Sequence, residues 1–356
     1  MTTVSGSERT ALAVLTAAAA LAAAAVLGGR ARWHAVPGRL TRPGPPVPPA
    51  LPPGRVVNLP GRGEVLVRDS GGPPARPAVL LLHGWTASAD INFFPAYATL
   101  AGPYRVIALD QRGHGRGMRS REPFSLEDCA DDAAALLEEL GAGRAIVVGY
   151  SMGGPAGMLL ARRHPERVAG LVMQATALEW HHTARERGVW RLLPVLDLGL
   201  RLGLGVGFFD RVIRAAARED PGLRGYQPWL AAEFQRATAR DLVAAGRALS
   251  RYDARPWAGQ LGIPAATLVT TRDRLVRPSK QRELAKALRA DVIEIDADHD
   301  LPLAKSAEYG RLTRLLVDTV AAASGLAQSG PARPRRKRVP PAAAGPAELR
   351  GRDDQV

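Results

Sequence analysis

Cysteine is nearly absent from this chain of 356 residues, and the single one, Cys129, excludes an intramolecular disulfide framework. A free cysteine is more often a buried apolar residue than a nucleophile. Cys129 follows a Ser-x-x-Asp helix start at Ser125 and lies among apolar positions, so we expect a buried thiol in a helix core. A nucleophilic role would require a neighbouring base, and the sequence offers none beside it.

The sequence also lacks the motifs of nucleic-acid and metal-binding proteins. It has no zinc-ligand spacing, no Walker phosphate loop and no aromatic RNA-binding motif. Its net charge of +14 is concentrated at the ends, because residues 1–55 carry +5 and residues 324–356 carry +4. Such charged flanks are typical of solvated tails or of contact with a membrane surface. We therefore expect no nucleic-acid partner, and the oligomeric state stays open.

Charge is absent from residues 11–29, which form a continuous run rich in alanine, leucine and valine. This run is about long enough to cross a bilayer as a helix, so residues 1–30 are predicted to be a transmembrane anchor or a signal-like segment. Four arginines follow between residues 30 and 42, and the positive-inside tendency favours a cytoplasmic catalytic domain behind an uncleaved anchor. A secreted or cell-surface enzyme with a cleaved leader is the alternative.

Proline and charge mark the segments around the globular part. Residues 31–54 are dense in proline, which predicts an extended, semi-rigid linker. Residues 324–356 read as a disordered basic tail, either solvated or touching anionic lipid. No internal repeat is visible between them.

In the central part, short apolar runs alternate with longer helical patterns, which predicts an α/β fold with a mostly parallel, doubly wound sheet. We expect helices near residues 92–101, 125–140, 152–163, 279–289 and 302–322. The expected strands are an opening hairpin at residues 55–59 and 64–69, followed by 78–82, 105–109, 145–149, 168–173, 265–270 and 292–295.

One stretch interrupts this alternation and divides the core into residues 55–177 and residues 258–323. Residues 178–257 are helical in character and rich in aromatic side chains, so we expect a helical lid over the site. Charged residues within positions 189–213 argue against a second membrane span there. An amphipathic lid that covers an acyl pocket or rests on a bilayer fits this composition better.

The most informative motif is Gly149-Tyr150-Ser151-Met152-Gly153, between an apolar strand pattern and a small-residue helix pattern. A bare G-x-S-x-G occurs often by chance, but this strand-to-helix context predicts a nucleophile elbow with Ser151 at its tip. The glycines allow a strained turn and a close approach of helix and strand. Ser151 is therefore the candidate nucleophile.

A serine hydroxyl needs a base that takes its proton and an acid that orients the base. Among the seven histidines, only His299 follows the last predicted strand, which makes it the candidate base. Asp273 follows the strand at 265–270, at the carboxyl end where site residues of such sheets belong, and is the candidate acid. Three further acids flank His299 and could assist: Asp296, Asp298 and Asp300.

The chain order Ser151, Asp273, His299 resembles that of the α/β hydrolase superfamily. The resemblance extends over about residues 55–322 and includes His83-Gly84-Trp85 and the Asp-Gln-Arg-Gly-His-Gly segment at 110–115. It is similar above all to capped serine esterases, monoacylglycerol-lipase-like enzymes and cofactor-free peroxidases. The resemblance implies structural roles for His83 and His114, and an oxyanion hole formed by the backbone amides of Trp85 and Met152.

We therefore expect a membrane-tethered serine hydrolase that cleaves a small-molecule carboxylic ester through an acyl-enzyme, without a metal ion or organic cofactor. A medium-chain or lipid-like acyl group would suit an aromatic and aliphatic lid. Acyl transfer, thioester hydrolysis, perhydrolysis and carbon–carbon bond hydrolysis would use the same three residues. A ligand-binding or membrane scaffold protein with this fold is the alternative outside catalysis.

Overall fold

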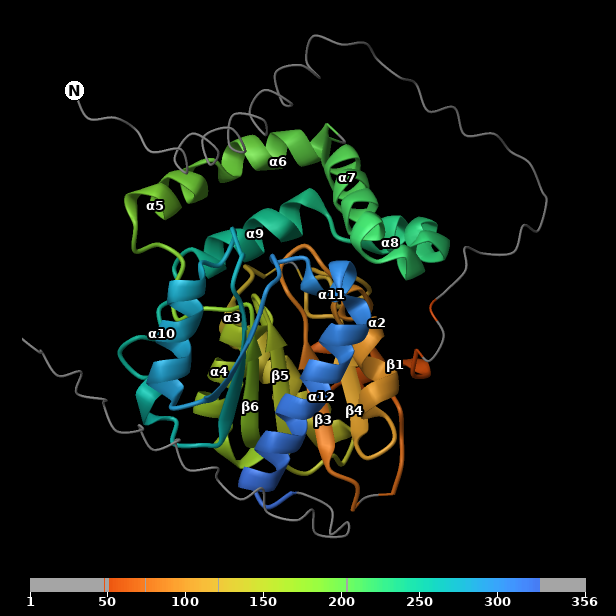
Figure 1. Ribbon diagram of the computed structural model, residues 1–356, viewed down its shortest axis with the longest axis vertical. Helices are drawn as coiled ribbons and strands as arrows, with labels where there is room; N and C mark the ends of the chain where they lie inside the picture. Colours follow the sequence, from red (N-terminus) through yellow and green to blue (C-terminus); the bar gives the residue numbers. More distant parts are fainter. Residues whose placement is uncertain (1–47, 49–50, 74, 121, 203, 327–356) are drawn as a thin grey trace, which may run out of the picture.

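The computed structural model describes residues 48, 51–73, 75–120, 122–202 and 204–326. Within these ranges, an eight-stranded sheet runs through the centre of the protein (Figure 1). Its strands are β1 (Gly54–Leu59), β2 (Gly63–Asp69), β3 (Ala78–Leu82), β4 (Arg105–Leu109), β5 (Ala145–Tyr150), β6 (Val168–Gln174), β7 (Ala265–Thr270) and β8 (Asp291–Ile295).

The strand order is β1-β2-β4-β3-β5-β6-β7-β8. The β1–β2 and β2–β4 pairs are antiparallel, and every later pair is parallel, so the expected hairpin and mostly parallel sheet are confirmed. The central strands read as continuous apolar runs because helices cover both faces of the sheet. β3, β5 and β6 are buried at every position.

Helices connect the strands and fill the space above them. They are α2 (Ala89–Leu100), α3 (Leu126–Glu139), α4 (Gly153–Arg163), α5 (Ala184–Arg191), α6 (Leu193–Arg201), α7 (Leu204–Glu219), α8 (Gln227–Phe234), α9 (Ala239–Leu249), α10 (Pro278–Leu288), α11 (Leu301–Ala304) and α12 (Ser306–Ala323). Three short 3₁₀ turns, η1 (Pro165–Arg167), η2 (Pro221–Tyr226) and η3 (Ala258–Gln260), join them.

Alternating strand side chains build two separate cores. Leu80 and Leu82 of β3 face the helices α3, α4 and α10, whereas Val79 and Leu81 face α2 and α12. This split follows from the two-residue period of a strand. Full burial of each such side chain contributes about 1.5–3 kcal/mol, so both helix layers fix the strand ends that carry the site.

Two sequence expectations differ from the structure in detail. The single helix expected at residues 302–322 is divided into α11 and α12 by Lys305, which has φ −139° and ψ 56° and is not helical. The helix expected from residue 92 begins earlier, because Ser88 caps it by accepting a hydrogen bond from the amide of Ile91. The thiol of Cys129 is buried as expected, and burial raises its pKa.

The insertion between β6 and β7 contains α5 to α9 and lies across the carboxyl ends of the strands (Figure 1). Its position agrees with the helical segment expected at residues 178–257. No helix within the described residues is long and apolar enough to span a membrane. The predicted anchor at residues 11–29, most of the proline-rich linker and most of the basic tail lie outside those residues.

Candidate active site

Ser151 occupies a sharp turn between β5 and α4. Its φ of 52° lies in the left-handed region, which is costly for a residue with a side chain. The turn is held because the amide of Ser151 donates to the carbonyl of Gln174 at 2.9 Å, and the amide of Gly154 donates to the carbonyl of Ser151 at 2.9 Å. The hydroxyl is thereby presented at the carboxyl end of the sheet, as an elbow requires.

Two glycines make this turn possible. A Cβ atom at Gly153 would lie 1.8 Å from the carbonyl oxygen of Leu82, and one at Gly149 would lie 2.5 Å from the carbonyl oxygen of Gly153. Neither backbone oxygen can move without breaking the packing of α4 against the strands. The elbow spacing in the sequence therefore has a direct steric cause.

The structure brings Ser151, His299 and Asp273 into one chain of hydrogen bonds. Nε2 of His299 lies 3.1 Å from Oγ of Ser151, and Nδ1 of His299 lies 2.8 Å from Oδ2 of Asp273. The three residues come from loops that follow β5, β8 and β7, which are separate in sequence but share one sheet edge. Both distances are within hydrogen-bond reach.

Asp273 is fully buried and fixed by several donors. Its Oδ1 accepts hydrogen bonds from the amides of Leu275 and Val276 at 2.9 and 2.8 Å. Its Oδ2 accepts from the hydroxyl of Thr270 at 2.8 Å and from Nε2 of Gln281 at 3.2 Å, in addition to its contact with His299. The carboxylate is held in one orientation, with Oδ2 directed at the imidazole.

The acids that flank His299 have other partners. Oδ1 of Asp298 accepts hydrogen bonds from the backbone amides of His299 and Arg274, and Asp296 forms an exposed ion pair with Arg272 at 2.7 Å. No hydrogen bond joins Asp296, Asp298 or Asp300 to the imidazole ring in the part of the chain that the structure describes. The geometry thus favours Asp273 as the partner of the ring.

Opposing effects set the pKa of His299. Burial lowers it, but the negative charge and hydrogen bond of Asp273 outweigh burial, so the pKa is raised above its ordinary value. The hydroxyl of Tyr150 donates to the carbonyl of His299 at 2.7 Å and fixes the backbone of the loop. The ring is therefore poised to hold a proton taken from the serine hydroxyl.

The loop after β3 lies against the elbow. A Cβ atom at Gly84 would be 3.1 Å from Cβ of Ser151, and the amide of Gly84 donates to Oδ1 of Asn92 at 2.7 Å. The amides of Trp85 and Met152 follow in the two loops, and neither donates to a partner within the described residues. They are thus available to a ligand atom.

Two histidines near the site are used in packing. His83 is buried, and its Nε2 accepts a hydrogen bond from the amide of Gln111 at 2.9 Å, whereas its Nδ1 lies 2.8 Å from the carbonyl of Gly84. Burial lowers the pKa of His83 to about 4 and that of His114 to about 3. Both rings stay neutral at pH 7 and join the β3 and β4 loops.

Sequence reasoning missed the residues that position the site. Asn92 holds the β3 loop, and Gln281 reaches from α10 to the carboxylate of Asp273. Each is an amide side chain on a helix that directly follows a site loop, and this placement was the available signal. The signal is weak, because polar residues at helix starts usually serve as caps.

The helical insertion contacts the site through Trp85. Its indole Nε1 donates to the carbonyl of Leu242 in α9 at 2.8 Å, and its ring lies 5.8 Å from that of Trp190 in α5. A Cβ atom at Gly246 of α9 would lie 2.9 Å from the Trp85 ring. The insertion therefore packs directly on the loop beside Ser151.

No group of three or more histidine, cysteine or acidic residues suited to a metal ion occurs among residues 51–73, 75–120, 122–202 and 204–326.

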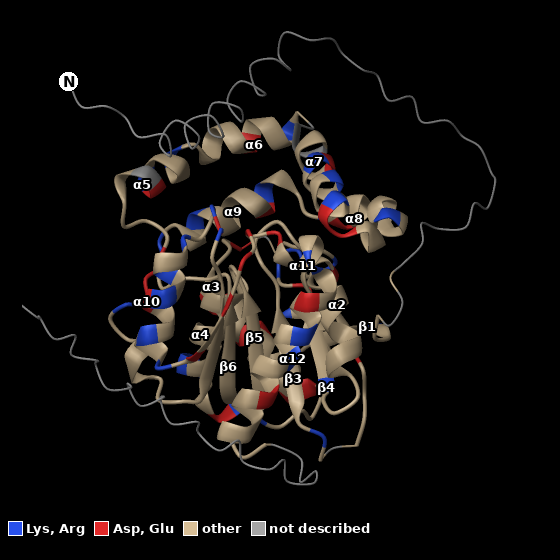
Figure 2. Ribbon diagram, in the orientation of Figure 1, with Lys and Arg blue, Asp and Glu red and all other residues tan. Residues whose placement is uncertain are grey.

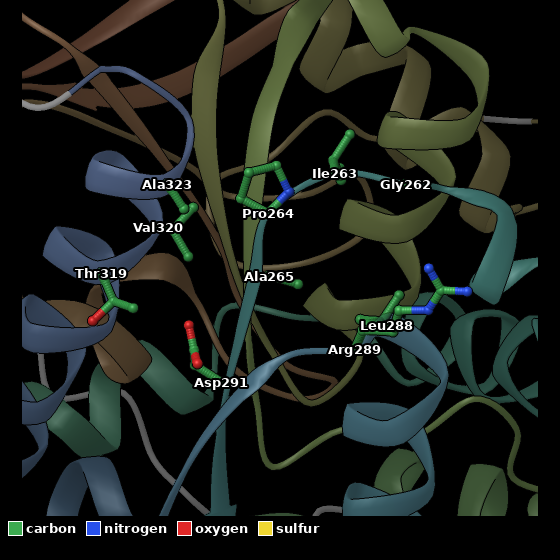
Figure 3. Close-up of a pocket in the computed structure, with 10 residues that line it drawn as sticks. All are labelled: Gly262, Ile263, Pro264, Ala265, Leu288, Arg289, Asp291, Thr319, Val320 and Ala323. Carbon is green, nitrogen blue, oxygen red and sulfur yellow. The ribbon is translucent and has the colours of Figure 1, made fainter. Parts of the chain in front are cut away.

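A surface pocket lined by Pro264, Ala265, Asp291 and Val320 lies at the amino ends of β7 and β8 (Figure 3). Ser151, Asp273 and His299 follow the carboxyl ends of their strands, so this pocket lies at the opposite edge of the sheet.

Comparison with known proteins agrees with this architecture. The family model of the alpha/beta hydrolase fold matches residues 77–199. Epoxide hydrolase B of Mycobacterium tuberculosis is 36% identical over 120 residues, which are 33% of this chain and 34% of that protein. The 2-(acetamidomethylene)succinate hydrolase of Mesorhizobium japonicum is 35% identical over 112 residues, 32% of this chain and 39% of that protein. The chain thus spans little more than a third of these relatives' lengths.

Among solved structures, the enol-lactonase from Burkholderia xenovorans superposes with a TM-score of 0.64 at 24% identity, over 74% of this chain and 99% of the enol-lactonase. This likeness concerns the fold. The matched family model, the related sequences and the superposed structure thus agree that the chain has the α/β hydrolase fold.

Proposed function

We propose that this protein is a serine hydrolase that cleaves carboxylic esters through an acyl-enzyme. The observation that carries the proposal is the continuous hydrogen-bond chain from Asp273 through His299 to Ser151, with distances of 2.8 and 3.1 Å. A base at hydrogen-bond distance from a strained, accessible hydroxyl is the arrangement that nucleophilic catalysis needs.

In the proposed reaction, Nε2 of His299 takes the proton of Ser151 as Oγ attacks the ester carbonyl. The tetrahedral oxyanion would accept hydrogen bonds from the amides of Trp85 and Met152, and loss of one such donor typically costs about 3–4 kcal/mol. His299 then protonates the leaving alkoxide, which departs as the alcohol. Water activated by His299 hydrolyses the acyl-enzyme and releases the acid.

Serine at position 151 favours acyl chemistry over epoxide opening. Attack of a serine on an epoxide would leave an ether, which water cannot hydrolyse by way of a carbonyl intermediate. Attack on an ester instead leaves an acyl group, which the same base and oxyanion donors can remove. The relationship to an epoxide hydrolase therefore supports shared architecture, and the nucleophile supports ester cleavage.

The proposed class of substrate rests on the helical insertion. We assign residues 178–257 as a lid, because α5 and α9 contact Trp85 beside the nucleophile. Aromatic and aliphatic side chains of this segment would suit a medium-chain or lipid-like acyl group. Residues 11–29 remain a predicted membrane anchor, with the catalytic domain on the cytoplasmic side.

The direct test is hydrolysis of p-nitrophenyl esters of increasing acyl length by the full chain and by its Ser151→Ala variant. We expect repeated turnovers that the variant abolishes, with a chain-length optimum set by the lid. Ser324→Ala, at the end of α12, is the matched control and should keep full activity. Equal turnover by the full chain and its Ser151→Ala variant would refute the proposal. Stoichiometric acylation without turnover would indicate a binding protein instead.

A further inference from the structure

The outer surface of the insertion exposes an unusual concentration of apolar side chains. Seven of the eleven exposed large hydrophobic residues in the described part of the chain fall between positions 189 and 208. Leu198, Leu202 and Phe208 are the most exposed of these, at 57%, 56% and 59%. Contiguous exposed apolar surface of this kind usually marks an interaction site.

These side chains point away from the rest of the protein. The buried face of α6 is carried by Leu193, which packs beside Gly246 of α9. Val195, Leu198 and Leu202 recur at intervals of three and four residues, so they share the opposite face of the helix. Figure 1 shows α5, α6 and α7 along the edge of the molecule most distant from the amino ends of the strands.

Basic residues lie within the same exposed stripes. Arg191 ends α5 beside the exposed Leu192, and Arg211 follows the exposed Phe208 by three positions on α7, so each lies near an exposed apolar neighbour. These two arginines are exposed and have no ion-pair partner among the described residues. Figure 2 shows the ribbon of α6 mostly uncharged and the ribbon of α7 marked by both basic and acidic residues.

The acidic residues of this surface do not offset those cations. Asp197 is paired with Arg201 at 2.9 Å, and Asp210 is paired with Arg214. The outer face thus combines an apolar centre with unpaired positive charge, the pattern that binds the headgroup region of an anionic bilayer. A second copy of this chain would be repelled, because the same arginines would face each other and the net charge is +14.

The described chain begins beside an apolar cluster to which α7 and α8 of the insertion contribute. Leu51 packs against the apolar cluster of Ile213 in α7 and Trp229 and Leu230 in α8. About 20 residues separate it from the uncharged run at residues 11–29, and a proline-rich segment of that length reaches roughly 60 Å. A bilayer that holds this run is therefore within reach of the insertion.

We propose that the outer face of α5, α6 and the first turns of α7, here called the insertion face, docks on an anionic lipid bilayer. The apolar centre would enter the boundary between headgroups and acyl chains to a depth of about 5–10 Å, with the arginines at the lipid phosphates. This inference does not depend on ester cleavage. It would place the candidate site directly behind the membrane-bound helices.

The test uses single reporter cysteines in the full-length chain, because the native Cys129 is buried and will not label. Leu198→Cys and its matched control Leu315→Cys, on α12 and 45% exposed, each carry an environment-sensitive fluorophore. Vesicles of phosphatidylserine and phosphatidylcholine are added, and the acyl chains in half of the samples carry a spin-label quencher. Both variants carry the same predicted N-terminal anchor, so a difference between them reports the local environment of each label.

We expect a blue shift and quenching by the labelled lipid at position 198, and neither at position 315. High salt and vesicles of phosphatidylcholine alone should weaken the signal at 198. Equal responses at the two positions, or none at 198 on vesicle-bound protein, would overturn the proposal. A shift at 198 without vesicles would overturn it too, with concentration dependence indicating a second copy and loss on deletion of residues 1–30 indicating the chain's own apolar run.

Discussion

Replacement of Asp273 by asparagine tests the candidate site at its most buried position. The amides of Leu275 and Val276 donate to Oδ1, so they will hold the carboxamide oxygen of the new residue at that place. The NH₂ group must then occupy the position of Oδ2, 2.8 Å from Nδ1 of His299. Because NH₂ is a donor, Nδ1 becomes an acceptor and the ring proton moves to Nε2.

That tautomer cannot take the proton of Ser151. The expected loss is about 10⁴-fold in kcat, which corresponds to about 5 kcal/mol of transition-state stabilisation. Steady-state hydrolysis of p-nitrophenyl butyrate measures it, and circular dichroism checks that the variant is folded. Asp296→Asn makes the same chemical change at an exposed ion pair with Arg272 and should leave kcat within about twofold, as is usual for surface sites.

The pH profile supplies an independent readout. Neutral His299 is the active form, so kcat/KM should rise with pH through the pKa of His299, which lies above its ordinary value of 6.5. Removal of the charge at Asp273 should move this limb to lower pH. Near-normal turnover of Asp273→Asn, or a large loss in Asp298→Asn instead, would refute the assignment of the orienting acid.

Two further predictions concern stability and are checked by thermal unfolding. Gly153→Ala should lower Tm by many degrees or prevent folding, because the new Cβ would lie 1.8 Å from the carbonyl oxygen of Leu82. The control Gly188→Ala on α5, where a Cβ would have no described atom of another segment within 4 Å, should leave Tm unchanged or raise it slightly. Equal effects of the two substitutions on Tm would contradict this steric explanation. Burial raises the pKa of Glu186, but hydrogen bonding to Lys280 outweighs burial and lowers this pKa to about 2. Glu186→Gln should therefore lower Tm at pH 7, and the difference in Tm between the two proteins should shrink as pH falls from about 4.5 towards 2. A difference in Tm that stays constant with pH would show that the charge of Glu186 is not its cause.

The strands were predictable because their apolar runs have a local cause. Five strands differ from the expectation by a single residue at one end, and three strands match it at both ends. The division between α11 and α12 was not predictable, since residues 301–323 keep a helical pattern throughout. Leu303 and Ala304 of α11 pack with apolar residues of the insertion, a contact between distant segments that no local pattern reports.

The residues of the candidate site likewise divide into those that the sequence pointed to and those that only the tertiary structure revealed. The sequence determined the elbow, because the glycines on either side of Ser151 reflect steric conflicts within one turn, and it determined the candidates Asp273 and His299 through their places after predicted strands. Only the tertiary structure decided which acid meets the imidazole, because Asp273, Asp296 and Asp298 are chemically alike and differ only in the direction that their loops give them. It also decided that Asn92 and Gln281 support the site and that the apolar residues of α6 face outward. Those outcomes depend on how distant segments pack together, and hydrophobic burial sets that packing over the whole chain at once.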